Sequence, residues 1–167
     1  DAFVQGVELS VMANLARHLD LGVDLTWNQG EYDNIRVDWA ETAFADDSRH
    51  ISRFPATTGN LKIEYSPKTW TFAVTGNYQG VMFIDYYNGE IDPAIGDQSK
   101  IKKTDPFMLV NARVSKKLNQ FKLYAGVNNL FNYLQDERHL DDAAFMYAPV
   151  YGRMLYAGLA LEIKHNH

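Results

Sequence analysis

The sequence predicts an all-β chain, an antiparallel transmembrane β-barrel of which about seven strands are present. Three observations predict this fold class. Apolar and polar residues alternate along most of the chain, a pattern typical of strands whose two faces meet different surroundings. Short and long connections follow one another between these strands. Aromatic residues make up 13% of the chain, and many fall near the strand ends, where a membrane interface favours them.

The first four predicted strands cover residues 3–15, 19–28, 60–65 and 70–79. In each of them, one set of alternating residues is apolar and the other set is mostly polar. In the second strand, Leu21, Val23 and Leu25 alternate with Asp20 and Asp24. Carboxylates without partners cannot sit in a dry core, so each strand needs one apolar side and one aqueous side.

The last three predicted strands cover residues 108–115, 121–128 and 154–164. In the first of these, Val110, Ala112 and Val114 alternate with Asn111 and Arg113. No charged residue lies in the middle of any of the seven apolar faces. These faces therefore suit lipid, and the opposite faces suit the aqueous lumen of a barrel.

The predicted connections are tight at residues 16–18, 66–69 and 117–120, and long and polar at residues 32–53, 88–105 and 134–149. Outer-membrane barrels have short turns on the periplasmic side and long loops outside, so we expect the same orientation here. Trp70 and Phe121 then lie toward the short-turn rim. The aromatic residues expected toward the long-loop rim are Trp27, Tyr32, Tyr78, Phe83, Tyr86, Tyr87, Tyr147 and Tyr151.

Several other classes of protein fit the sequence poorly. No apolar run approaches the ~20 residues of a membrane-spanning helix, and a net charge of −5 argues against a nucleic-acid partner. The chain has no cysteine, no Gly-rich phosphate loop and no HExxH helix, so we expect no enzyme activity. A soluble ligand-binding β-barrel is an alternative, which a folded monomer in plain buffer would favour.

The odd number of strands bears on the domain organisation. Single-chain bacterial barrels use even numbers of strands, and seven strands alone would leave two unpaired edges. We therefore expect residues 1–167 to be the C-terminal part of a larger barrel domain. The N-terminal strands and any export signal would then lie outside this sequence.

Four segments carry a family resemblance. They are Gly6-Val7-Glu8-Leu9, Arg53-Phe54-Pro55-Ala56 followed by Asn60-Leu61, Gly126-Val127-Asn128-Asn129-Leu130-Phe131-Asn132, and Tyr151-Gly152-Arg153. In their order and spacing, the chain resembles the C-terminal portion of the barrel of TonB-dependent outer-membrane receptors, with loops similar to those of receptors from the Bacteroidota. One feature differs from the family, because such barrels usually end on an aromatic residue. Here Ile163 takes that place, and Lys164-His165-Asn166-His167 follows.

The resemblance implies a barrel of 22 strands in the outer membrane of a Gram-negative bacterium, with a plug domain outside this chain. It also implies active transport of a scarce nutrient of the iron-siderophore, haem or cobalamin type, energised by TonB. The implied partners are the remaining barrel and plug, the TonB-ExbB-ExbD complex, outer-membrane lipids and a surface lipoprotein. A passive porin or a structural outer-membrane barrel is the alternative function, and steady ion conductance of the full-length protein would favour it.

For a receptor, the long loops are the expected ligand-contact surface. The candidate residues are Arg49, His50, Tyr86, Tyr87, Arg138, His139, Met146 and Tyr147. His50 or His139 could ligate a haem iron, and Met146 with the tyrosines could form a platform for a chelate or corrin ring. Carboxylate oxygens suit Ca²⁺, and the candidate ligands are Asp46, Asp47, Asp141 and Asp142. Alternatively, all of these residues only make the rim polar and anchor it.

Two of the family motifs lie where strands end or begin. Asn128 is the last residue of the sixth predicted strand, and Asn129 and Asn132 follow it. Asparagine side chains can satisfy free backbone groups there, so we expect all three to shape the rim. Gly152 would permit close approach of another group, and Arg153 would reach headgroups or loop carboxylates. We expect neither Gly152 nor Arg153 to contact the substrate.

Overall fold

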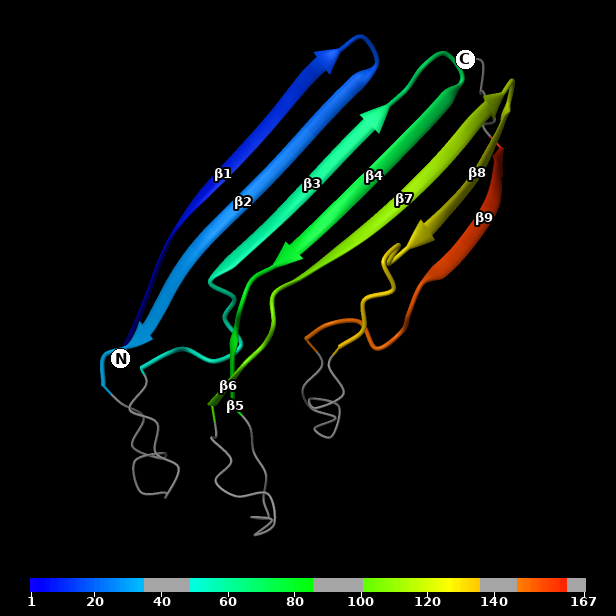
Figure 1. Cartoon of the computed structure of the whole chain (residues 1–167). Coiled ribbons are helices and arrows are strands. Elements are labelled where there is room, and N and C mark those ends of the chain that lie inside the picture. Colours follow the sequence, from blue (N-terminus) through cyan, green and yellow to red (C-terminus); the bar gives the residue numbers. More distant parts are fainter. Residues whose placement is uncertain (35–48, 86–100, 136–146, 162–167) are drawn as a thin grey trace. The chain divides into compact units, whose positions relative to one another are not determined.

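The computed structural model of the chain describes residues 1–34, 49–85, 101–135 and 147–161. Seven strands form one sheet in the order β1-β2-β3-β4-β7-β8-β9, and neighbouring strands run in opposite directions (Figure 1). Their bounds are β1 Ala2–Ala16, β2 Leu19–Tyr32, β3 Thr57–Tyr65, β4 Trp70–Gln79, β7 Phe107–Leu118, β8 Phe121–Asn128 and β9 Met154–Leu161. The all-β antiparallel fold that the sequence predicts is confirmed.

All seven predicted strands are present, and several are longer than alternation indicates. β2 continues to Tyr32, four residues past its predicted end. The sequence does not predict this extension, because Asn28, Gln29 and Glu31 are all polar and the alternation is lost there. The predicted end of the last strand, residues 162–164, lies outside the described residues, as does the rest of the tail. Within the described residues, no helix is long and apolar enough to cross a membrane.

A second, two-stranded sheet was not predicted. β5 (Phe83–Asp85) pairs antiparallel with β6 (Ile101–Lys103), with Phe83 opposite Lys103 and Asp85 opposite Ile101. Each strand has three residues, too few for alternation to be recognised. The second long connection therefore leaves the sheet through a short hairpin stem.

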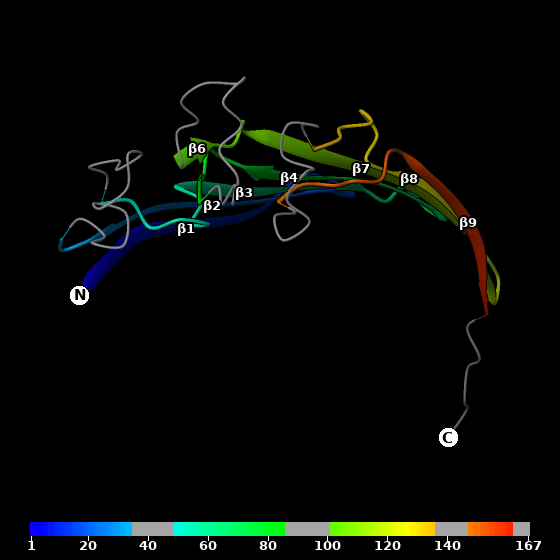
Figure 2. The ribbon, with the colours of Figure 1, turned by 90° about the horizontal axis from the view of Figure 1, so that it is seen from below.

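The chain divides into two compact units. The first comprises residues 1–8, 26–58 and 79–107, and contains β5, β6 and the strand ends that lead into the first two long connections. The second comprises residues 9–25, 59–78 and 108–167, and contains parts of β1 and β2, nearly all of β3, β4 and β7, and all of β8 and β9. Within the second unit, β8 and β9 follow β7 in a single layer of strands (Figure 2).

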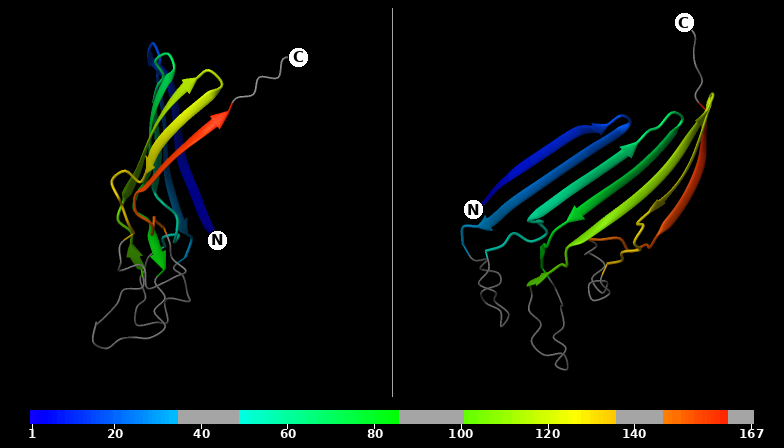
Figure 3. Two further views of the ribbon diagram at one scale, coloured as in Figure 1. Left: turned by 90° about the vertical axis from the view of Figure 1, so that its right-hand side faces the viewer. Right: turned by 45° about the horizontal axis from the view of Figure 1, so that its top comes forward.

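The three short turns lie together at one end of the strands of the second unit (Figure 3). Each contains a residue with a positive φ: 70° at His18, 54° at Lys68 and 53° at Asn119. Backbone hydrogen bonds join neighbouring turns, because Ser66 N donates to His18 O at 2.8 Å and Lys117 N donates to Thr69 O at 2.8 Å. These turns reverse the chain within two to four residues, as the sequence predicts.

The apolar residues of the sheet are largely exposed. Leu9, Leu123 and Leu159 expose 55%, 46% and 60% of their surface. In the described part of the chain, only Met82 and Phe107 are buried apolar residues. The sheet has no hydrophobic interior of its own in this region, so its apolar face needs an apolar environment outside the chain.

Candidate ligand-contact surface at the loop bases

Each of the three long connections leaves from a hydrogen-bonded stem, which we call a loop base. At the first loop base, Tyr32 N donates to Arg49 O at 2.8 Å, and Glu31 forms an antiparallel bridge with His50. The second loop base is the β5-β6 pair. The third is closed by Gln135, whose N donates to Pro149 O at 2.9 Å. These bases fix the points from which the predicted ligand-contact loops start.

The first loop base carries a chain of polar side chains. Gln5 donates to Gln29 at 3.1 Å, Gln29 donates to Glu31 at 3.1 Å, and Arg49 Nη2 lies 3.0 Å from Glu31 Oε2. The side chain of Arg49 is 50% exposed. A guanidinium has five N–H donors, so Arg49 can bond to Glu31 and still offer donors to an anionic ligand.

His50 lies against an aromatic residue of β5. The rings of His50 and Phe83 are stacked, with centroids 3.8 Å apart and planes 13° apart. Lys103 of β6 places its Nζ 5.0 Å from the Phe83 centroid. The first unit thus brings two positively charged side chains, Arg49 and Lys103, and the ring of His50 to two neighbouring loop bases beside the ring of Phe83.

Lys103 and Phe83 were not predicted as part of a ligand-contact group. Lys103 lies in a stretch that the sequence marks only as a polar loop, and its contact with Phe83 depends on the β5-β6 pairing. In the described part of the chain, no three side chains of His, Asp or Glu gather as a metal site. The haem-ligand role of His50 stays a prediction.

Gln135 holds the third loop base together. The sequence does not predict this role. It is only 3% exposed, and its Oε1 accepts hydrogen bonds from Tyr147 N at 3.0 Å and Ala148 N at 3.2 Å. Tyr147 is therefore placed at the foot of its loop, half-buried, with its backbone engaged by Gln135. In the sequence, this glutamine looks like any other polar loop residue.

Asn129 and Asn132, between the end of β8 and the third loop base, form a further set of hydrogen bonds. We call this set the asparagine link. Asn129 is 7% exposed, its Oδ1 accepts from Tyr133 N at 2.8 Å, and its Nδ2 donates to Tyr133 O at 2.7 Å and to Tyr151 O at 3.4 Å. Its own N donates to Asn111 Oδ1 at 3.0 Å. The side chain of Asn129 thus replaces strand pairing where β8 ends.

Asn132 connects this segment to the start of β9. Its Oδ1 accepts from Arg153 N at 2.8 Å, and a Cβ atom at Gly152 would lie 2.5 Å from the same oxygen. The close approach that Gly152 was expected to permit is therefore confirmed. The two family motifs, residues 126–132 and 151–153, are bonded to each other, and the predicted rim-shaping role holds for Asn129 and Asn132.

The opposite, polar face of the second unit carries cross-strand hydrogen bonds. These bonds join Ser10 to Asp24 at 2.6 Å, Asn77 to Asn60 at 2.6 Å and Asn111 to Thr75 at 3.3 Å, and Asn14 also donates to Asp20. All eight residues belong to the polar sets that alternation predicts. The predicted separation of faces is confirmed by these contacts.

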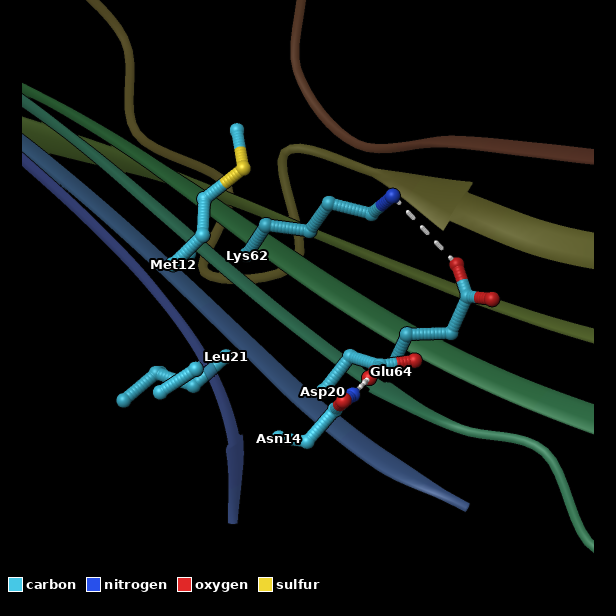
Figure 4. Close-up of a pocket in the computed structure, with 8 residues that line it drawn as sticks. Met12, Asn14, Asp20, Leu21, Lys62 and Glu64 are labelled. Carbon is cyan, nitrogen blue, oxygen red and sulfur yellow. Dashed lines mark hydrogen bonds and ion pairs between the residues drawn. The ribbon is translucent and has the colours of Figure 1, made fainter.

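A hollow of about 390 Å³ lies near the short turns on this polar side. Lys62 Nζ lies 3.4 Å from Glu64 Oε2. Figure 4 shows this pair and the hydrogen bond between Asn14 and Asp20. Each charged group of the hollow is bonded to another group of the hollow. Its charged groups are therefore satisfied by one another, and no grouping of its lining side chains points to a ligand.

The remaining predicted site residues lie outside the described residues. They are Tyr86, Tyr87, Arg138, His139 and Met146, and the candidate Ca²⁺ ligands Asp46, Asp47, Asp141 and Asp142. Their roles stay predictions.

Comparison with known proteins identifies the family. Residues 1–130 match the family described as TonB dependent receptor-like, beta-barrel. A mutant of the ferric enterobactin receptor PfeA from Pseudomonas aeruginosa matches with a TM-score of 0.54 and 20% identity, over 79% of this chain and 17% of that chain. FpvAI, in a complex with pyocin S2, matches with a TM-score of 0.60 and 18% identity, over 80% of this chain and 16% of that chain.

The chain thus spans about a sixth of the length of these two solved receptors. The family match covers β1 to β8, the same strands whose alternation and turns define the two-faced sheet. Members of this family are receptors and not enzymes, which agrees with the expectation that the chain carries no catalytic site. The chain belongs to the TonB-dependent receptors and forms part of their β-barrel.

Proposed function

We propose that this chain is part of the wall of an outer-membrane receptor that imports a scarce nutrient by TonB-dependent active transport. The observation that carries the proposal is the family match over residues 1–130, on a sheet with one apolar and one hydrogen-bonded polar face. Strands of this kind suit a wall between lipid and an aqueous lumen. The remaining strands, in a barrel of 22, and a plug domain would be supplied by the rest of the protein.

For the cargo, an iron-siderophore complex is the first choice. One solved relative is named as a ferric enterobactin receptor. The half-exposed Arg49 and the nearby Lys103 could bond to an anionic chelate, and His50 and Phe83 offer ring surface. Haem and cobalamin are the other cargo classes, and Ca²⁺ held by the loop aspartates is a further proposal.

The partners follow from this mode of transport. TonB, with ExbB and ExbD, would transmit energy to the plug, and a surface lipoprotein would assist capture of the cargo. Transport in this scheme makes or breaks no bond in the cargo. The protein binds the cargo at the outer loops and moves it through the lumen.

Uptake measurements in the source bacterium test the proposal. Cells lacking the receptor gene, cells complemented with the full-length gene and cells lacking TonB are given labelled ferric siderophores, haem or cobalamin at nanomolar concentration. Complemented cells should import one of these cargoes, and both deletion strains should fail. Uptake that is unchanged in cells without TonB would contradict active transport.

A conductance measurement separates the porin alternative. The purified full-length protein is inserted into planar bilayers, where a plugged receptor should pass almost no steady current. A steady conductance from every inserted molecule would favour the passive porin.

A further inference from the structure

Lys116 occupies an unusual place on the apolar face of β7. In alternation it stands in the row Val110, Ala112, Val114 and Leu118, so one lysine interrupts the apolar row near the short-turn end of the strand. Its Nζ lies 4.7 Å from the centroid of the Trp70 ring on the neighbouring strand β4. The hydrogen bond from Lys117 N to Thr69 O, at 2.8 Å, holds the two strands together at this level.

The surroundings of Lys116 are aromatic and exposed. Trp70 stacks on Phe72 with centroids 5.9 Å apart, and Phe72 stacks on Tyr65 at 6.4 Å. These three rings are 40%, 44% and 46% exposed. They form a continuous ring surface, open to whatever lies outside the wall, beside one positive charge.

No carboxylate compensates Lys116 within the described residues. On the polar face near the short turns, Glu64 is paired with Lys62 and Asp20 is bonded to Asn14. Arg17 and Lys68, in the adjoining short turns, are exposed and add positive charge. Lys116, Arg17 and Lys68 thus bring positive charge to the short-turn end, and positive charge complements an anionic surface.

We propose that Lys116 and Trp70 form a binding site for the headgroup of an anionic phospholipid. The phosphodiester accepts hydrogen bonds from the ammonium protons that point away from the Trp70 ring, and the acyl chains lie along Phe72, further from the short-turn end of β4. The ring holds the lysine in place before lipid arrives, so little further ordering of the side chain is needed. This inference rests on the proposed function, because it requires the apolar face to contact membrane lipid.

Quenching of Trp70 fluorescence by brominated lipids tests the site. The full-length receptor is placed in vesicles that contain either brominated phosphatidylglycerol or brominated phosphatidylcholine as a minor component. The difference in emission between the natural protein and a Trp70→Phe variant isolates Trp70. Trp70 should associate about fivefold more strongly with phosphatidylglycerol, the contribution of one lysine near an anionic surface.

The matched variants separate the site from general charge. Lys116→Gln should reduce the preference to near unity, whereas Lys116→Arg should keep it. Lys122→Gln, one strand away on the polar face, should leave the preference unchanged. An equal quenching of Trp70 by both lipids, or a preference that survives Lys116→Gln, would overturn the proposal. Absence of quenching by either lipid would instead contradict the membrane location of this face, and with it the proposed function.

Discussion

Asn129 adopts a left-handed backbone conformation, with a φ of 53°, and its amide bonds to backbone groups of Tyr133 and Tyr151. These groups lie past the end of β8, where no neighbouring strand offers partners. Asparagine suits this position because its short amide both donates and accepts and because it tolerates positive φ. A side chain of this kind lets a strand end without leaving backbone groups unpaired.

Replacing Asn129 tests how much these bonds stabilise the barrel. Asn129→Ala should lower the free energy of unfolding by about 3 kcal/mol more than Asn119→Ala, since about three hydrogen bonds of about 1 kcal/mol each are lost. Asn119 is a matched control, because it is an exposed asparagine with the same φ of 53° in the turn between β7 and β8. Urea unfolding of the full-length receptor in lipid vesicles measures both variants. Equal losses for the two would mean that only the backbone conformation matters.

At the scale of elements, β8 and β9 are matched by two reciprocal pairs of tyrosine and glycine. Tyr124 lies opposite Gly158, and Tyr156 lies opposite Gly126. A Cβ atom at either glycine would overlap the opposite tyrosine ring. The guanidinium of Arg113 lies 4.6 Å from the centroid of Tyr124, which extends the packed group to β7. A shift of one residue in register would place both rings against side chains, so these pairs specify the register.

Gly158→Ala should therefore lower the free energy of unfolding by about 1–3 kcal/mol, because the added methyl group displaces the Tyr124 ring. Gly22→Ala is the matched control. It is also a strand glycine of the polar face, and the nearest neighbour of its Cβ would be Lys62 Cβ at 3.8 Å, an ordinary contact. The control should be neutral or slightly stabilising, as expected for alanine in place of glycine in a strand. Unfolding of both variants in the same vesicles compares them, and a neutral Gly158→Ala would contradict the packing argument.

Alternation was sufficient to predict the long strands and their faces, because each strand from β1 to β9, apart from β5 and β6, carries a period of two over many residues. It could not reveal the contacts made between segments far apart in the sequence. Gln135 bonds to Tyr147, and Phe83 contacts both His50 and Lys103, yet none of these residues stands out from its polar or mixed surroundings. The asparagine link was anticipated only as rim-shaping polarity, since its bond to Arg153 N depends on how the chain returns to β9.

At the scale of the whole molecule, the apolar side chains of the described strands are exposed and need an apolar partner outside the chain. Exposed leucines, valines and aromatic residues run along the seven long strands, while buried apolar residues in the described part are few. A lipid environment would cover this face without a second layer of protein. The polar face needs no such cover, because its side chains bond to one another across the strands and can face water.

Two neighbouring residues of β4 test this division of faces. Val74→Lys places a charge in the middle of the apolar face, where Val74 is 38% exposed, and should cost about 2–4 kcal/mol of stability in lipid vesicles. Ala73→Lys adds the same charge on the polar face and should be tolerated. Insertion and unfolding of the two full-length variants in vesicles are compared. A barrel that tolerates Val74→Lys as well as Ala73→Lys would mean that Val74 does not face lipid.

The three loop bases carry a consequence for how such receptors can be altered. Gln135 joins both sides of the third long loop, and Tyr32 with Arg49 joins both sides of the first. The residues between these junctions can therefore be exchanged for the loop of another receptor without changing the spacing of the two attachment points. If the long loops contact the cargo as proposed, we expect that loops with other binding properties can be inserted between the same junctions, with the strands kept unchanged.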